Sequence, residues 1–261
     1  MNLDNYRLVW EDDFNYEGRP DPAKWTYDVG NQWFNRELQA YTDRETNVCV
    51  KDGNLIISAI TEKQGDKEYT SARIKTKGLA AWTYGYFEFR AILPKGVGSW
   101  PAIWMMPDTD RLTEKDKSKF GLIPEDLHWP NCGEIDIMEH VGRRQNNVLF
   151  SLHCKNHNHA NPATVGYTKA AQFEEDLSAG YHVYAMEWTE EYIEYFVDGV
   201  SYCRYNKADD IVEKMHDSWP FDKPYYLIMN VAVGGGLGGP VADDDLPFEM
   251  LVDYVRVYQK K

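Results

Sequence analysis

Short runs in which apolar and polar residues alternate recur along the whole chain, with turn residues between them. In residues 84–93, Phe87 and Phe89 face one way and Glu88 and Arg90 the other, which is the two-residue period of a half-buried strand. Further strands are predicted at residues 6–10, 55–59, 70–76, 147–153, 182–188, 192–197, 200–204, 225–233 and 250–258. Because no long amphipathic helix interrupts them, the pattern predicts an all-β sandwich or barrel rather than an α/β fold.

Three stretches depart from this alternation. Residues 31–41 mix amide and aromatic side chains without a helical period, and they predict a loop that displays these groups. Residues 108–130 form a long polar insertion, which we expect to make one wall of a binding site and to offer Trp129 to it. A short helix is predicted in residues 207–218, where one face would hold Ile211, Val212 and Met215.

Two tryptophans flank a proline in residues 95–107. Pro101 lacks a backbone N–H and is unfavourable in a central strand. We therefore expect Trp100 at the edge of a loop and Trp104 in the strand that follows. A tryptophan can belong to the core or serve as a ligand platform, and the acidic strand that comes next in the chain favours a cleft.

That acidic strand, residues 133–141, is the most unusual segment. Glu134, Asp136 and Glu139 stand inside an apolar, β-branched run, although carboxylates are rarely buried without a partner. Strict alternation places Glu134 and Asp136 on one face and Glu139 on the other. A β-bulge, which we place at Met138, would reset the register and bring the three acids into one row.

Such a row predicts chemistry rather than a solvated strand face, because like charges along one face repel each other. Two carboxyl groups about 5–5.5 Å apart are the arrangement of a retaining glycoside hydrolase. Its carboxyl groups act as a nucleophile and as a general acid and base.

Composition and charge narrow the choice of substrate. Aromatic residues make up 14% of the chain, with 9 Trp and 18 Tyr, which suits a sugar-binding cleft. The net charge of −14 argues against nucleic acid and against a polyanionic polysaccharide as partners. The chain contains no apolar run of about 18 residues, so no membrane-spanning helix is predicted. Residues 1–9 lack the pattern of a signal peptide.

The four cysteines are scattered without the spacing of a zinc site. We expect buried free thiols, with one or two disulfides as the alternative. The residues concerned are Cys49, Cys132, Cys154 and Cys203.

Other polar residues are candidates for binding roles. The irregular spacing of His153, His157 and His159 disfavours zinc, and we expect His153 to contact the carboxylates or a sugar. Asn230 stands in an apolar strand and needs a hydrogen-bond partner if it is buried. The glycine-rich residues 234–240 lack the context of a phosphate loop and are interpreted as a flexible loop that lines the cleft.

Acidic residues at the end of the first predicted strand and within the last one leave their roles open. The run of Glu11, Asp12 and Asp13 fits either a cation site or a solvated turn. Asp253, among apolar residues of the last strand, suggests a cation or a hydrogen-bond role.

The segment Glu134-Ile135-Asp136-Ile137-Met138-Glu139 resembles the signature of glycoside hydrolase family 16, in its bulge-containing, laminarinase-like branch. This resemblance implies a β-jelly-roll sandwich of two antiparallel sheets with an open cleft on the concave face, formed by residues 1–261 as a single catalytic domain. It covers nearly the whole chain, including Leu8-Val9-Trp10, Asn35-Arg36-Glu37-Leu38-Gln39, Trp100-Pro101-Ala102-Ile103-Trp104-Met105 and Val252-Asp253-Tyr254-Val255-Arg256-Val257-Tyr258.

The resemblance also implies roles for individual residues. Glu134 would be the nucleophile, Glu139 the general acid and base, and Asp136 their electrostatic partner. No cofactor is expected for catalysis, but a structural Ca²⁺ is implied. The implied substrate-binding residues are Asn35, Arg73, Trp100, Trp104, Trp129 and His153, and the implied calcium ligands are Asp13, the backbone of Gly53, and Asp253.

Three positions differ from the family pattern near the expected subsites. Residues 149–153 lack the usual His-Gly-Thr, Phe34 stands where Gly is usual, and Leu237 stands where Trp is common. We therefore expect mixed-linkage β-1,3/1,4-glucan as the preferred substrate, with laminarin also cleaved. The alternatives are hydrolysis of another polysaccharide, such as an agar-type galactan, and a non-catalytic carbohydrate-binding sandwich. We expect a monomer that is secreted or located at the cell surface or in the periplasm.

Overall fold

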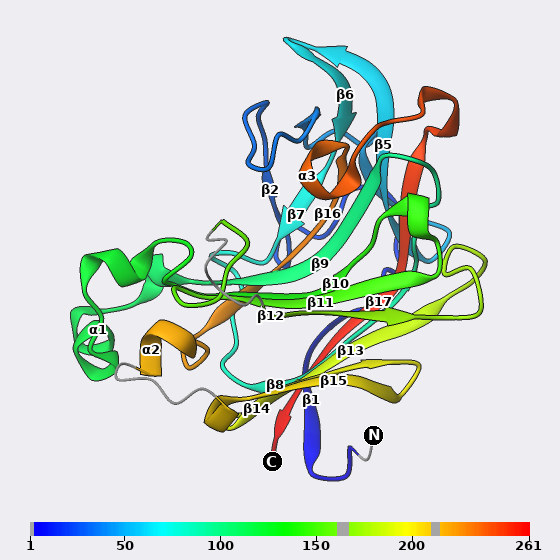
Figure 1. Cartoon of the computed structure of the whole chain (residues 1–261). Helices are drawn as coiled ribbons and strands as arrows, with labels where there is room; N and C mark the ends of the chain where they lie inside the picture. The colour runs from blue at the N-terminus through cyan, green and yellow to red at the C-terminus, as the bar shows by residue number, and fades with distance from the viewer. Residues whose placement is uncertain (1–2, 161–166, 210–214) are drawn as a thin grey trace.

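Two stacked sheets form the centre of the computed structural model, which describes residues 3–160, 167–209 and 215–261 (Figure 1). Within these residues the outer sheet contains ten strands. Eight of them follow one another in the order β15 (Val200–Asn206), β14 (Tyr192–Val197), β13 (His182–Trp188), β8 (Gly85–Ile92), β17 (Phe248–Lys260), β5 (Asn54–Gln64), β6 (Lys67–Ser71) and β3 (Gln39–Tyr41). The other two lie off this path, because β1 (Tyr6–Asp12) pairs with β17 and β4 (Val48–Lys51) pairs with β5. The cleft sheet contains seven, in the order β12 (Tyr167–Gln172), β11 (Asn147–His153), β10 (Glu134–Glu139), β9 (Ser99–Pro107), β16 (Tyr225–Val233), β7 (Arg73–Lys75) and β2 (Thr26–Asp28). The predicted jelly-roll sandwich of two antiparallel sheets is confirmed, although β3 and β6 pair in parallel.

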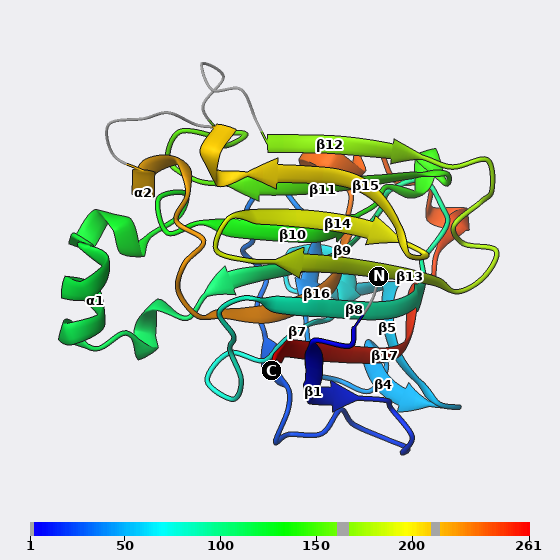
Figure 2. The same cartoon turned by 90° about the horizontal axis from the view of Figure 1, so that it is seen from below.

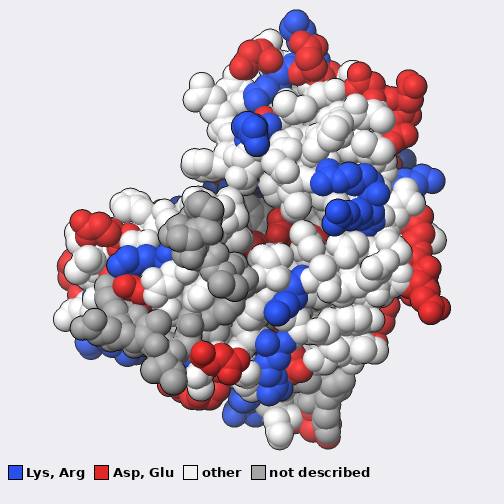
Figure 3. Space-filling view, in the orientation of Figure 1, with Lys and Arg blue, Asp and Glu red and all other residues white. Residues whose placement is uncertain are grey.

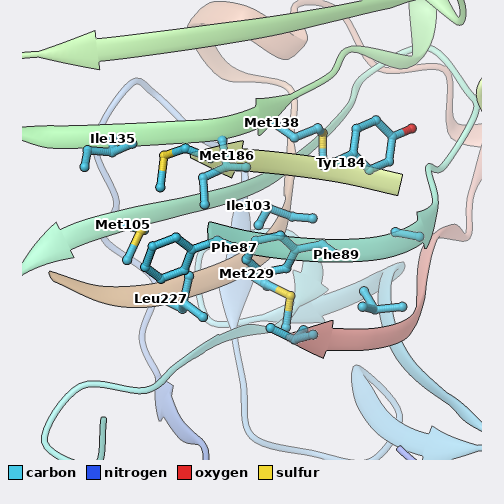
Figure 4. Packing of buried hydrophobic residues seen from close by; sticks show 14 of the residues in the cluster. Phe87, Phe89, Ile103, Met105, Ile135, Met138, Tyr184, Met186, Leu227 and Met229 are labelled. Atoms are coloured by element: carbon cyan, nitrogen blue, oxygen red, sulfur yellow. The ribbon is translucent and has the colours of Figure 1, made fainter. Parts of the chain in front are cut away.

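Apolar side chains from both sheets fill the space between them (Figure 4). Phe87 and Phe89 of β8 meet Ile103 of β9 and Ile135 and Met138 of β10, and all five are fully buried. Burying a side chain of this size contributes roughly 1.5–3 kcal/mol. The two phenylalanines of β8 thus face the core, and the polar residues that alternate with them face the other side of the sheet. Figure 2 shows the strands of the two layers from the side of the outer sheet.

The strand predicted at residues 70–76 is two strands in different sheets. β6 ends at Ser71 in the outer sheet, and β7 begins at Arg73 in the cleft sheet. The Ser71 hydroxyl donates a 2.6 Å hydrogen bond to the Val231 carbonyl of β16 at this crossing. The prediction of one strand is therefore wrong. It arose because the alternation of polar and apolar residues continues through the crossing. The sequence pattern does not report a change of partner strand.

Trp100 and Pro101 lie inside β9, between β10 and β16, and not at a loop edge. The Pro101 carbonyl accepts a 3.1 Å hydrogen bond from the backbone N–H of His140, just beyond the end of β10. Both backbone groups of a strand residue point to the same side. The N–H that Pro101 lacks would thus face the end of β10, where its loss disturbs the ladder least.

The bulge predicted in the acidic strand is present in β10. Its place differs by one position from the prediction. Asp136 pairs with Trp104 and Met138 with Ile103 of β9, so the extra residue is Ile137 and not Met138. Ile137 and Met138 are both fully buried between the sheets, although successive strand residues normally face opposite sides. Glu139 therefore returns to the face that carries Asp136. Without the extra residue, its carboxylate would point into the apolar core.

The polar insertion is partly helical. It contains η1 (Thr109–Arg111), α1 (Glu114–Phe120) and η2 (Pro124–Leu127). Thr113 and Asp116 form a capping box at the start of α1, and Gly121 ends the helix with φ 63°. None of the α1 residues is buried, so the helix has no apolar face that a periodicity argument could detect. Among the described residues, no helix is long and apolar enough to cross a membrane.

In the described part of residues 207–218, where a helix is predicted, the chain forms η4 (Lys207–Asp209) and α2 (Met215–Ser218). Ile211 and Val212 of the predicted helix lie outside the described residues.

Two predicted loops contain regular structure. Within residues 31–41, Gln39–Tyr41 form the buried strand β3, which pairs with β6. Within residues 234–240, Gly235–Gly238 form one helical turn, α3. Two further short turns are η3 (Gly142–Arg144) and η5 (Asp243–Asp245).

The four cysteines are free thiols, which confirms that expectation. Cys132, Cys154 and Cys203 are buried, and Cys49 is half-buried. Burial raises the pKa of the Cys132 thiol to about 12. A thiol of this kind stays protonated at neutral pH and is unreactive.

The positions predicted to bind calcium adjoin one another on the outer sheet. β5 and β1 pair with successive parts of one edge of β17, and Asp253 lies at the changeover. Asp13 directly follows β1, and Gly53 lies in the turn between β4 and β5. Asp253 is the extra residue of a second bulge, where its Oδ2 pairs with Arg90 of β8.

We propose that Ca²⁺ binds at this changeover through Asp13, the Gly53 carbonyl and Asp253, since these positions supply oxygen donors from three neighbouring segments. An ion at about 100 times its Kd would raise the melting temperature by about 5 °C or more. Calcium added to chelator-treated protein should produce this shift, Asp253→Asn should abolish it, and the exposed Asp244→Asn should retain it. If neither chelator nor added calcium changes the melting temperature, the proposed calcium site is refuted.

Candidate active site

A cleft of about 890 Å³ lies over the cleft sheet. Its floor consists of alternate side chains of β9, β10, β11 and β16, whose other side chains face the core. In Figure 3 acidic atoms appear inside a recess near the middle of the view. Its lining includes Phe34, Asn35, Glu37, Arg73, Trp100, Ala102, Trp104, Trp129, Glu134, Asp136, Glu139, Leu149, Ser151, His153, His159, Thr168, Tyr226, Asn230, Gly236 and Leu237.

All nine residues predicted from the sequence to be catalytic or substrate-binding line this cleft. The insertion contributes Trp129, whose ring centroid lies 6.2 Å from that of His153 and 5.1 Å from that of His159. Trp100 and Trp104 enter from alternate positions of β9. The predicted cleft residues are therefore brought together from six separate segments of the chain.

The row of three carboxylates in β10 occupies the cleft floor. The side chains of Glu134 and Asp136 are within hydrogen-bonding reach of each other. Glu139, displaced along the row by the bulge, accepts a 3.1 Å hydrogen bond from the Trp100 indole N–H and a 3.4 Å hydrogen bond from the Ser151 hydroxyl. These two donors hold the carboxylate in one orientation.

His153 stands beside the row because β11 pairs its position directly with Glu134. Its Nε2 lies 3.2 Å from Asp136 Oδ2 and 3.9 Å from Glu134 Oε1. The predicted contact of His153 with the carboxylates is therefore confirmed. Each of these residues also offers one ligand atom within 4.8 Å of the others, a spacing that could hold a metal ion.

The surroundings raise the pKa of all three carboxyl groups. For Glu134 the main cause is burial, followed by the charge of Asp136. For Asp136 it is burial, followed by the charge of Glu139. Burial also raises the pKa of Glu139, and His153 opposes this rise. The row thus retains protons at pH values where exposed carboxyl groups are ionised, and these protons belong to the coupled set.

A hydrogen-bond chain extends from the cleft centre toward one end. The Trp104 indole N–H donates to Asn230 Oδ1 at 2.8 Å, and the Asn230 amide donates to the Tyr41 hydroxyl at 3.0 Å. That hydroxyl donates to Glu37 at 3.2 Å. Both the oxygen and the nitrogen of the Asn230 side-chain amide thus have a hydrogen-bond partner. The same chain of hydrogen bonds fixes the orientation of the Trp104 ring.

Arg73 lies between two aromatic rings at the same end. Its guanidinium is 4.8 Å from the centroid of Trp104 and 5.3 Å from that of Trp33, and it pairs with Asp28 at 2.9 Å. The crossing from β6 to β7 brings Arg73 to this position.

Sequence reasoning missed several cleft residues. Serine and threonine are too common for local sequence to mark them as functional. The pairing of β11 with β10 brings Ser151 to the site, and the pairing of β12 with β11 brings Thr168. Glu37 carried a usable signal, because it is an acidic residue among amides and aromatics in a segment already predicted to face a ligand. Burial raises the pKa of Glu37.

Comparisons with known proteins agree with this geometry. The sequence profile of Glycosyl hydrolases family 16 matches residues 34–255. A beta-glucanase of Rhodothermus marinus is 46% identical over 261 residues, which covers 98% of this chain and 86% of the relative. The X-ray structure of the laminarinase from Rhodothermus marinus superposes with a TM-score of 0.87 at 44% identity and covers 98% of both chains. SCLam, a non-specific endo-beta-1,3(4)-glucanase from family GH16, superposes with a TM-score of 0.84 at 40% identity and covers 99% of this chain and 92% of its own.

Removal of one carboxylate from the row should stabilise the fold at neutral pH. A raised folded-state pKa means that the native chain binds more protons than the unfolded chain, so stability falls as pH rises above the ordinary carboxyl range near 4. Glu134→Gln and Asp136→Asn should each raise the melting temperature at pH 7, by about 2–4 °C for each kcal/mol of relieved repulsion. The gain should disappear below about pH 3, where the carboxyl groups of both the folded and the unfolded chain are protonated. Glu174→Gln, an exposed control, should show no such pH-dependent gain, and variants that are no more stable than the native chain at pH 7 would contradict this account.

Proposed function

The chain belongs to glycosyl hydrolase family 16 and is a β-glucan hydrolase, and we propose that its carboxylate row cleaves the glucan internally with retention of anomeric configuration. The observation that carries the proposal is the bulge in β10, which turns Glu139 onto the cleft face beside Asp136. A carbohydrate-binding protein has no need of a buried row of like charges. For an enzyme that must attack and protonate across one bond, the row supplies both groups.

In the proposed first step, a Glu134 carboxylate oxygen bonds to the anomeric carbon while the glycosidic C–O bond breaks. Glu139 gives its proton to the departing oxygen, and its own carboxylate is then stabilised by the donors Trp100 and Ser151. Asp136 can take the proton that it shares with Glu134, which leaves Glu134 ionised for attack.

In the second step, water attacks the anomeric carbon and loses a proton to Glu139. The ester bond to Glu134 breaks, and both glutamates return to their starting states. Every proton in this cycle is held by a residue of the row, so we propose that catalysis needs no metal or other cofactor.

We propose mixed-linkage β-1,3/1,4-glucan as the preferred substrate, with laminarin also cleaved. The beta-glucanase and the non-specific endo-beta-1,3(4)-glucanase reported above support both linkages. An uncharged polymer suits a chain with a net charge of −14. An agar-type galactan is the second candidate, because the row alone does not select the sugar. We propose that the enzyme acts as a monomer outside the cytoplasm, where such polymers occur.

Measurement of reducing ends released from barley β-glucan, laminarin and agarose tests this choice. We expect release from both glucans and none from agarose. Product analysis on the mixed-linkage polymer should show mid-chain cleavage from the earliest time points. If the enzyme releases no reducing ends from either glucan, the proposed function is refuted.

Replacement of the two glutamates distinguishes their roles. Glu134→Ala and Glu139→Ala should each lower kcat on polymer by about 10³-fold or more, whereas the exposed Glu125→Ala should not. On a substrate with an activated aryl leaving group, azide should give an α-glycosyl azide with Glu134→Ala, because azide replaces the nucleophile. With Glu139→Ala it should give the β-glycosyl azide, because azide replaces the water of the second step. The reverse pattern, or product of inverted configuration from the native enzyme, would overturn the assignment.

A further inference from the structure

Phe34 is the most exposed large apolar residue in the described part of the chain, at 84% exposure, and it lines the cleft. We propose that Phe34 is the platform of an outlying sugar subsite, on which a glucosyl ring of the polymer stacks at a distance from the bond that is cleaved. The inference rests on the proposed function and adds a residue that selects for chain length.

The position of Phe34 follows from the strand register. One row of paired positions, Glu139, Ala102, Asn230 and Arg73, runs across β10, β9, β16 and β7. Adjacent strands are about 4.8 Å apart, so three spacings place Arg73 about 14 Å from the catalytic strand. Trp33, the neighbour of Phe34, packs against Arg73. Phe34 thus adjoins the end of this row that is remote from the carboxylates.

The backbone around Phe34 is held in place. The Asn35 carbonyl accepts a 2.8 Å hydrogen bond from Gly236 of α3, and the Leu38 N–H donates to the Val233 carbonyl at 3.0 Å. A Cβ at Gly235 would lie only 2.9 Å from the Asn35 oxygen, so the close approach depends on this glycine. Asn35 has φ 59°, a left-handed conformation that reverses the chain directly after Phe34.

These contacts keep Phe34 outside the core, where water covers its ring. Exposure of a phenyl group is unfavourable, and the ring gains free energy when an apolar surface covers it. A glucosyl ring in a β-glucan carries its hydroxyl groups around the rim and presents C–H groups on its faces. Such a face can cover the phenyl ring without leaving a hydroxyl group buried and unpaired.

Stacking on Phe34 has a limited effect on selectivity. A phenyl ring has no hydrogen-bonding group, so it recognises a sugar face and not the linkage that precedes it. Because the backbone is already held and Phe has only two side-chain torsions, little conformational entropy is lost on binding. The contact should therefore favour chains long enough to reach it and leave the chemical step unchanged.

The test compares Phe34→Ala and Phe34→Trp with the native enzyme on polymeric β-glucan and on an aryl β-glycoside of a glucose disaccharide. An aromatic contact of this kind corresponds to about a two- to tenfold effect on affinity. We expect Phe34→Ala to raise KM for the polymer by this factor with kcat unchanged, and to leave both constants for the short substrate unchanged. Phe34→Trp should restore the polymer KM. The control Tyr202→Ala removes an exposed aromatic residue of β15, outside the cleft. It should leave KM and kcat unchanged for both substrates.

Direct binding separates this inference from the proposed function. In the Glu134→Gln background, calorimetry with mixed-linkage and β-1,3-linked glucan hexasaccharides should show weaker binding when Phe34→Ala is added, and equal binding of the disaccharide. Unchanged hexasaccharide affinity would overturn the subsite, as would an equal loss of activity on the short substrate. A native enzyme that fails to cleave either glucan while hexasaccharide binding still depends on Phe34 would refute the proposed function and leave the subsite standing.

Discussion

Burial of like charges in one strand is the constraint on which the rest of the structure depends. Glu134, Asp136 and Glu139 share one face of β10, and burial raises the pKa of each. Such a row is unfavourable unless its surroundings hold it together. The opposite face of β10 provides this support, since Ile135 and Met138 are fully buried against the outer sheet.

The same constraint explains the cleft around the row. Polar donors reach the carboxylates from neighbouring strands, with Trp100 from β9 and Ser151 from β11 bound to Glu139. Farther from the row, the chain from Trp104 through Asn230 to Tyr41 satisfies buried polar groups and fixes the cleft floor. A rigid floor suits catalysis because the protein groups need not reorganise when charge develops on the substrate.

The sequence predicted much of this structure because alternation is a local property. The strands at residues 147–153, 182–188, 192–197 and 225–233 have the predicted bounds, and the bulge in β10 follows from the register of its acids. The errors have a common origin. Pro101 lies in a central strand because β10 ends opposite its missing N–H, which local sequence does not show. The single strand predicted at residues 70–76 divides because its partner changes at Ala72, and α1 has no buried face to produce a period.

The sequence by itself singled out the three carboxylates to which we assign the chemistry. Carboxylates are rare in an apolar strand, and the spacing of Glu139 requires a bulge. The sequence also determined the fold class, since strand periodicity depends on neighbours in the chain. Only the tertiary structure decided which distant segments complete the site. Pairing of β11 with β10 sets His153 beside Glu134, and the docking of residues 35–38 on β16 and α3 holds Phe34 in the open cleft. Such contacts depend on strand order and loop packing, which join residues far apart in the chain and leave no periodic trace in the sequence.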